Sequence, residues 1–394
     1  WYGPSVSAGK YYRQNGKLYK AKVDQSTLSV TPDTDDTQQY WQVAIDGSAQ
    51  YPYYSLWDAV LGMEPGDELR ISKTVDPSVN ESITLSYTDG SDYVVCASGT
   101  PIYLAPKAHI GSDEIGWWEV KSVSGNSYQL QKKYRGSSVT IPMQQLRGST
   151  IHWSNYSSPC IVAATINGLP NSHIKISGGW DIALEAAEGP DDSHRTGRTR
   201  ILSNALALQV GTCFNLASSS YVDVSNIEFY IMGSAINLAS TTRCSVSDII
   251  SGGCVVVATG SNASYAKLNN IKAYGGTYGI TNIGGNNHLI TNSQALSCQY
   301  GMFLSGNQLP QVDGIYTVGC NYGLCFTGNY RSKVRNTEIE KASTFGLYNT
   351  NGHWEDIEVD VHDMEGGIPI GLQLPVGIVV KAKQTVEADI NEVM

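Results

Sequence analysis

Val224-Ser225-Asn226-Ile227 is the first copy of a four-residue pattern that recurs as far as Val361: an apolar residue, a polar residue, Asn or Asp, and usually Ile. The later copies are Val246-Ser247-Asp248-Ile249, Leu268-Asn269-Asn270-Ile271, Ile290-Thr291-Asn292-Ser293, Val312-Asp313-Gly314-Ile315, Val334-Arg335-Asn336-Thr337 and Trp354-Glu355-Asp356-Ile357. The third positions are separated by five intervals of 22 residues and a last interval of 20. A fixed period of this length is typical of a solenoid, in which every copy is one structural turn.

The spacing of the apolar residues places a bend inside each copy. Inward-facing residues of a strand are two apart, yet Val224 and Ile227 are three apart, so the alternation slips at the Asn position. Asn and Gly tolerate the left-handed torsions of such a bend, and stacked copies from Asn226 to Asp356 predict an amide ladder. The pattern predicts an all-β, right-handed parallel β-helix with about 22 residues per coil. A leucine-rich horseshoe is disfavoured because its Leu framework and helical segments are missing.

Composition narrows the class of function. Only 16% of the 394 residues are charged, while 40 Gly and 24 Tyr favour strands and turns. The net charge of -10 argues against nucleic-acid binding, which needs clustered Lys and Arg. No apolar run approaches the ~18 residues of a membrane span. Eight cysteines show neither a CxxC pair nor a Cys/His metal spacing, so we predict no metal site and no cofactor.

Residues 1–46 have the features of a separate small β module. Tyr11 to Ala21 indicates two short strands joined at Asn15-Gly16, and a polar loop leads on to Trp41. Over about 35 residues this segment resembles the small chitin-binding type carbohydrate-binding modules. The resemblance implies a sugar-stacking platform made by Tyr19 and Trp41. The alternative is that both rings fill the core of a very small module.

The remaining chain divides into four parts. Residues 47–79 predict a capping helix with Ser55 as its N-cap, followed by a first coil strand at Leu69. This order resembles the opening of secreted parallel β-helix polysaccharide enzymes, whose helix covers the open end of the coil. Residues 80–150 lose the period and suggest an antiparallel β insertion or irregular early coils. Residues 151–367 form the β-helix, and residues 368–394 form a cap or the start of a truncated trimerisation region.

Two columns of residues follow the bend. The positions six residues past the bend, from Met232 to His362, are mostly small or polarisable residues and suit a buried corner. In this column Cys298 and Cys320 would be joined by a disulfide bridge or would be buried thiols. The outward positions include an apolar stripe with Tyr274 and Tyr316, which needs a cover. We expect that cover to be other subunits of a homotrimer, with bound glycan as the alternative.

The first candidate catalytic site is a group of carboxylates on the last two coils. The last two copies of the pattern place Glu338 near Glu358 and Glu340 near Asp360. The resulting distances of about 5 to 9 Å bracket those of retaining and inverting glycoside hydrolases. Like charges this close would raise at least one pKa, as a general acid requires. The alternative is a solvated acidic face that nearby Lys and Arg neutralise.

The second candidate is the polar loop from Trp180 to Arg200, which interrupts the coil. It holds Asp181, Glu185, His194 and Arg198, a set able to neutralise a uronate carboxylate and abstract a proton as polysaccharide lyases do. A salt-bridged excursion without function is the alternative.

Together, the coil and the amino-terminal module resemble phage tailspikes and related glycan-active β-helix proteins. The resemblance covers about 340 residues in architecture, although the Gly-Asp-Gly start common in tailspike β-helices is absent. It implies a homotrimeric virion tail protein that binds a bacterial surface polysaccharide, with or without depolymerising it. A secreted, monomeric polysaccharide lyase or hydrolase is the second hypothesis, and a non-catalytic structural or adhesive protein is the third.

Overall fold

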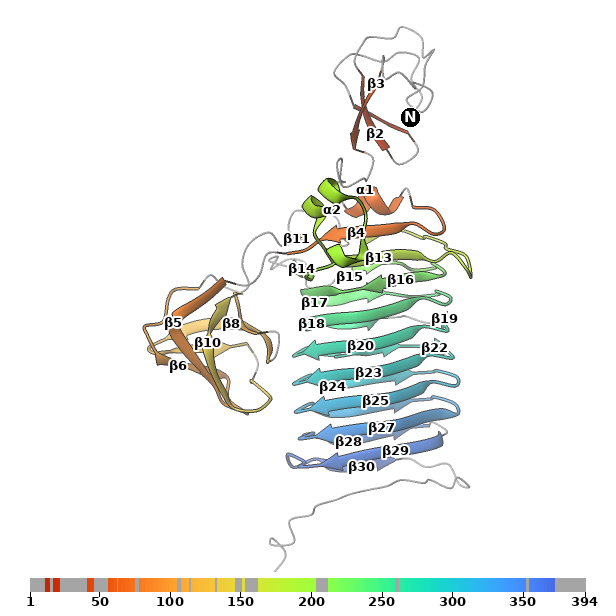
Figure 1. The fold of residues 1–394 in the computed structure, drawn as a ribbon. Helices are drawn as coiled ribbons and strands as arrows, with labels where there is room; N and C mark the ends of the chain where they lie inside the picture. Colours follow the sequence, from red (N-terminus) through yellow and green to blue (C-terminus); the bar gives the residue numbers. More distant parts are fainter. Residues whose placement is uncertain are drawn as a thin grey trace, which may run out of the picture.

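The structure of the chain is a computed structural model. It describes residues 11–14, 17–21, 41–45, 56–61, 63–74, 78–104, 108–112, 115–131, 133–145, 151–152, 162–202, 212–258, 262–351 and 354–372. Two bodies dominate Figure 1: a tall stack of coils and a smaller barrel beside it.

The stack is the predicted parallel β-helix. Strands of successive coils pair in parallel, for example Leu268 with Ile290 and Ile290 with Val312, so the 22-residue period is the register. Its strands are β4 (Glu68–Ser72), β11 (Ile151–His152), β12 (Val162–Ala163), β13 (Ile174–Trp180), β14 (Thr199–Leu202), β15 (Thr212–Asn215), β16 (Val222–Ser225), β17 (Ile227–Asn237), β18 (Ser245–Ala258), β20 (Lys267–Tyr274), β21 (Thr281–Ile283), β23 (Leu289–Leu296), β24 (Tyr300–Ser305), β25 (Gln311–Val318), β26 (Tyr322–Thr327), β27 (Ser332–Glu340), β28 (Phe345–Thr350), β29 (Trp354–His362) and β30 (Ile368–Leu372), with a side pair β19 (Ala263–Ser264) and β22 (Gly285–Asn286).

The bends lie where the parity argument placed them in six of the seven copies. Asn226, Asp248, Asn270, Asn292, Gly314 and Asn336 all have φ between 47° and 68°. The Asn side chains among them bond to a neighbouring coil, as when Asn270 Nδ2 donates to Asp248 Oδ1 at 2.7 Å. Asp356 is the exception, because it is paired with Lys333 on β27 rather than with Asn336.

Inside the coil, the apolar residue before each bend and the Ile after it are buried, and they form one continuous core. Cys298 and Cys320 belong to this core as buried thiols that donate to the carbonyl oxygens of Leu296 and Ala295, at 3.5 and 3.6 Å. Of the two alternatives for Cys298 and Cys320, buried thiols rather than a disulfide bridge are therefore found.

The first strand and a short helix lie at one end of the stack. Helix α1 (Leu56–Leu61) buries Val60 in the coil core, and β4 pairs in parallel with β13. An open coil end would expose apolar core, and the helix covers it. At the other end β30 pairs with β28, so paired strands continue past residue 367, where the sequence pattern ends.

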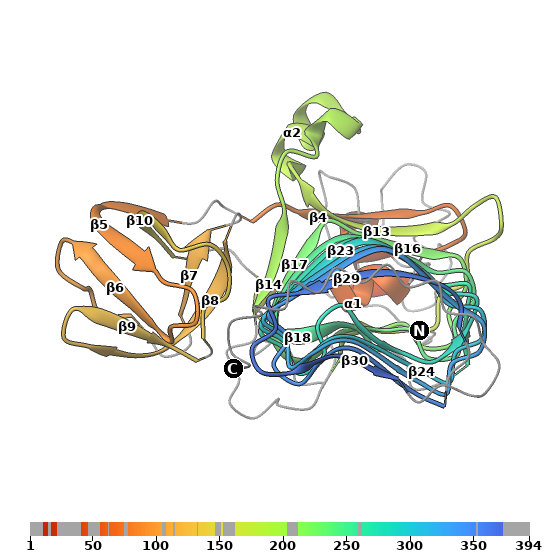
Figure 2. The same cartoon turned by 90° about the horizontal axis from the view of Figure 1, so that it is seen from below.

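Residues 78–145 form a closed antiparallel barrel, which is the insertion alternative rather than irregular coils. Its strands are β5 (Ser78–Tyr87), β6 (Tyr93–Ser98), β7 (His109–Ser112), β8 (Gly116–Ser124), β9 (Ser127–Leu130) and β10 (Val139–Gln145). Figure 2 shows the barrel beside the ends of β14 and β18. Its core includes Trp118 and Tyr134 and is continuous with outward residues of the coil, among them Tyr230 and Tyr274.

Two smaller pieces complete the description. Strands β1 (Tyr11–Gln14), β2 (Lys17–Ala21) and β3 (Trp41–Ile45) form an antiparallel sheet in which β1 and β2 pair as a hairpin. The side chains of Tyr19 and Trp41 lie outside the described residues, as does Ser55. The polar loop after Trp180 contains helix α2 (Ile182–Glu188) and the 3-10 turn η3 (Asp192–His194), which project from the coil in Figure 2.

Candidate functional site

The acidic group on the last coils is built by the register of β27 and β29. Glu338 pairs with Asp360, and Glu340 pairs with His362. At the bend, Arg335 and Asn336 lie opposite the single residue Glu358. Glu338 is 52% exposed and Asp360 is exposed, so the two carboxylates share one solvent-facing column.

This register corrects the expected stacking of Glu338 on Glu358 and Glu340 on Asp360. The error arose because the Trp354–Ile357 copy was aligned with the bend of the coil before it. The structure instead pairs Asp356 with Lys333 and compensates with an irregularity two residues later. Asp356 is also ion-paired with Arg335, whose guanidinium reaches it from the neighbouring coil.

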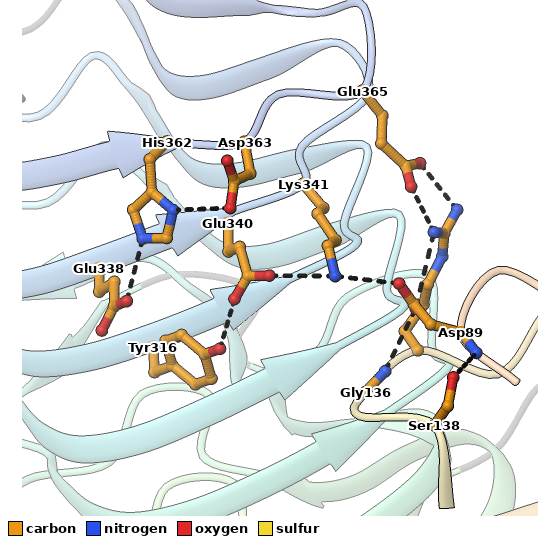
Figure 3. A network of polar contacts seen from close by, with 11 residues as sticks. Asp89, Gly136, Ser138, Tyr316, Glu338, Glu340, Lys341, His362, Asp363 and Glu365 are labelled. Carbon is orange, nitrogen blue, oxygen red and sulfur yellow. Dashed lines mark hydrogen bonds and ion pairs between the residues drawn. The ribbon is translucent and has the colours of Figure 1, made fainter. Parts of the chain in front are cut away.

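His362 does not lie where the repeat pattern predicts. It was expected in a buried corner, but its side chain is 26% exposed and its Nε2 donates to Glu338 Oε1 at 3.0 Å (Figure 3). Burial lowers the pKa of His362, but its bonds to Glu338 and Asp363 outweigh that effect and raise the pKa above the usual value. A protonated His362 therefore places a positive charge 3.0 Å from Glu338 Oε1.

Glu340 is held by its neighbours rather than open to a substrate. Tyr316 donates its hydroxyl to Glu340 Oε2 at 2.7 Å, and Lys341 Nζ lies 3.1 Å from Oε1. Burial first, and this bond second, raise the pKa of Tyr316, so the phenol stays a donor. Lys341 also bonds Asp89 of the barrel at 2.9 Å, and Arg135 of the barrel pairs with Glu365 (Figure 3).

The expected sugar-binding role of Tyr274 is contradicted by its burial. Tyr274 is 4% exposed, and its ring lies 6.1 Å from Trp118 of the barrel in an edge-to-face arrangement. The same barrel covers Tyr230, Ile250 and Leu296. The upper part of the apolar stripe is therefore covered within the chain, and not by another subunit.

In the second candidate, three of the four residues hold the excursion together. Asp181 caps α2 by accepting from the Leu184 amide at 3.1 Å, and its bond to Lys73 is the main cause of its lowered pKa. Glu185 is buried and paired with Arg70, which lies over the Trp180 ring at 3.9 Å. His194 is buried with its Nε2 3.6 Å from Glu188.

Arg198 is placed differently from those three residues. With Arg195 and Arg200, it lines an open cleft of ≈ 550 Å³. Asn226 and Asp248 of the bend ladder also line this cleft. The signal in the sequence for this cleft is the set of three arginines at the start of β14 and just before it.

A further aromatic column, not identified from the sequence, crosses the sheet formed by β24, β26 and β28. Tyr278, Tyr300, Tyr322 and Phe345 stack in succession, with centroid separations of 5.2, 4.7 and 5.8 Å. The first three are 22 residues apart, which is the signal that would have found them. Because each ring covers the face of the next, the column presents mainly ring edges and does not offer an open face for stacking on a sugar.

The comparisons with known proteins agree with the fold. The family described as right handed beta helix region matches residues 253–358, and no curated protein matches. Among the described residues, no helix is long and apolar enough to cross a membrane, and no group of three His, Cys, Asp or Glu is placed to hold a metal.

Three solved structures are similar at low identity. The tailspike protein of Pseudomonas phage LKA1 is 12% identical, with a TM-score of 0.23 over 82% of this chain and 65% of that chain. The tailspike of Acinetobacter baumannii bacteriophage AP22, in complex with capsular saccharide, is 11% identical, with a TM-score of 0.30 over 82% and 59%. The catalytic domain of a GH87 alpha-1,3-glucanase, in complex with tetrasaccharides, is 10% identical, with a TM-score of 0.28 over 80% and 89%. This chain spans less than two thirds of either tailspike chain, and at these identities the likeness concerns the fold alone.

Proposed function

We propose that this protein binds a bacterial surface polysaccharide and hydrolyses it at Glu338 and Asp360. The observation that carries the proposal is the pairing of these two exposed carboxylates on adjacent coils. Adjacent strands are about 4.8 Å apart, close to the ~5 Å between the two carboxyl groups of retaining glycoside hydrolases. Glu358 lies at the bend and Glu340 is held by Tyr316 and Lys341, so neither is as well placed.

We assign a role to each carboxylate. Glu338, oriented by the 3.0 Å bond from His362, is the nucleophile that attacks the anomeric carbon. Asp360 donates a proton to the departing glycosidic oxygen and then removes a proton from the water that releases the sugar. His362 positions Glu338 and supplies no atom to the substrate.

The test is depolymerisation of purified bacterial surface polysaccharides, followed by release of reducing ends. Glu338→Gln and Asp360→Asn should each lower the rate at least about 100-fold, because each removes a group needed for general acid–base or nucleophilic work. Glu358→Gln is the matched control, since it removes one carboxylate from the neighbouring bend and should leave the rate nearly unchanged. Full activity in Glu338→Gln would exclude this site.

The proposed biological setting is a phage tail, with the chain acting as a homotrimeric receptor-binding protein. A secreted monomeric enzyme would use the same carboxylates. A protein that binds the polysaccharide without cutting it would match the third hypothesis, a structural or adhesive role, and would contradict the hydrolytic part of the proposal alone.

A further inference from the structure

The cleft that follows η3 is lined by three arginines, Arg195, Arg198 and Arg200. It opens where the chain returns from η3 to the coil, and Asn226 and Asp248 complete its lining. Its volume of ≈ 550 Å³ is within the range of sites that hold small ligands. Asp181, Glu185 and His194 have the structural roles described above, so none of them gives this cleft a function.

The three arginines of the cleft have different partners. Arg200 Nε lies 2.6 Å from one oxygen of Glu228, and Arg198 Nε lies 3.6 Å from the other. Glu228 is 0% exposed, so it serves as a fixed internal partner for both. Arg195 is exposed and donates to the Gly178 carbonyl and the Ser225 hydroxyl, at 3.3 and 3.0 Å.

The partners of Arg195 indicate what the cleft would accept. Arg195 bonds two neutral groups, a carbonyl and a hydroxyl, and Arg198 reaches Asp248 through its backbone carbonyl at 3.3 Å. A guanidinium presents a planar fork of donors that matches a carboxylate. One exposed guanidinium whose described bonds go to neutral groups suits a singly charged carboxylate better than a phosphate monoester, which carries nearly two negative charges.

We propose that this cleft is an anion subsite that binds the carboxylate of an acidic sugar residue. This deepens the proposed function, and rests on it, by making the polysaccharide an acidic one. Glu228 belongs to the same register column as Glu338, five coils away, or roughly 24 Å at 4.8 Å per coil. The exposed amides of Asn270 and Asn292 lie between the two sites along the bend ladder.

The experiment measures binding of a short oligogalacturonate by calorimetry, in comparison with the same oligomer after its carboxyl groups are reduced to alcohols. The variants are Arg195→Gln and Arg198→Gln, with Arg331→Gln as the control because it removes an exposed arginine elsewhere on the coil. Arg200 is left in place, since its removal would strand the buried Glu228. Thermal unfolding of each variant verifies that the coil is intact.

We expect the acidic oligomer to bind at least tenfold more tightly than the reduced one, and each cleft variant to weaken that binding about tenfold while Arg331→Gln does not. Inorganic phosphate that displaces the oligomer at equal concentration would contradict the choice of a carboxylate. Equal binding of acidic and reduced oligomers, or unchanged binding in both cleft variants, would overturn the subsite. Arg-dependent binding of the acidic oligomer by a protein that cleaves no polysaccharide would uphold the subsite and contradict the proposed hydrolysis alone.

Discussion

Asn292 shows how one residue type sets the path of every coil. Its φ of 49° is left-handed, and its Nδ2 donates to Asn269 Oδ1 at 3.1 Å on the coil before. Gly314 takes the same place on the next coil with a φ of 68°. The bend therefore needs a residue that tolerates left-handed torsions, and the amide adds a bond between coils.

The torsion and the bond between coils can be separated by two substitutions of Asn292. Asn292→Ala loses both the bond and the torsional tolerance, and should lower the free energy of unfolding by about 1 to 3 kcal/mol. Asn292→Gly loses only the bond and should be less destabilising. Denaturant midpoints measure both, and an alanine variant as stable as the glycine variant would contradict the torsional argument.

His288 gives a second prediction at this scale, in the pH dependence of stability. It is 1% exposed, its Nδ1 accepts from the Ala266 amide at 3.3 Å, and burial lowers its pKa to about 4. His288 takes up a proton near pH 6.5 in the unfolded chain and only near pH 4 in the native chain. The stability that neutral His288 contributes is therefore complete above pH 6.5 and declines as the pH falls below it. The wild type should lose up to about 1.4 kcal/mol per pH unit in that window relative to His288→Asn. Parallel stability profiles for the two proteins between pH 6.5 and 4 would contradict this.

At the scale of elements, the sequence correctly predicted the features that depend on contacts between adjacent coils. The bends of β18, β20 and β23 followed from local parity, because each coil pairs only with the coils beside it. The β27–β29 register did not follow, since a coil can absorb an irregularity at its bend and restore the pairing afterwards. Glu338 was therefore found, while its partners Asp360 and His362 were assigned wrongly.

The repeat pattern could not predict where the barrel docks on the coil. Trp118 and Tyr274 are far apart in the sequence, and nothing in the period of the coil indicates which face the insertion covers. The alternation did show that Tyr274 points outward, and only the structure shows what lies against it.

The element-scale prediction tests that contact. Tyr274→Ala removes a buried ring between β20 and the barrel, and should lower stability by about 3 to 5 kcal/mol, with loss of amide protection concentrated in residues 78–145. Tyr330→Ala is the control, because that ring is 52% exposed and should change stability by less than about 0.5 kcal/mol. If Tyr274→Ala instead lowered glycan affinity and left stability intact, Tyr274 would be a sugar-binding residue after all.

At the scale of the whole molecule, we predict a homotrimer. With the stripe on β20 and β23 covered by the barrel, we expect neighbouring subunits to cover the half-buried aromatic column from Tyr278 to Phe345. Native mass spectrometry should give three times the mass of one chain, and Tyr322→Asp should shift the protein to monomers because it places a charge in that face. A wild-type monomer would favour the secreted enzyme.

The barrel also restricts how this protein can evolve. It contacts the coil at Tyr230 near the top of the docked face and at Glu365 near the bottom, through His109 and Arg135 respectively. Solenoids commonly gain or lose whole repeats by duplication and deletion, and here each such event would shift one of these anchors by about 4.8 Å relative to the other. The number of coils between them should therefore be inherited unchanged wherever the barrel is retained, and lineages that have lost the barrel should be free to vary it.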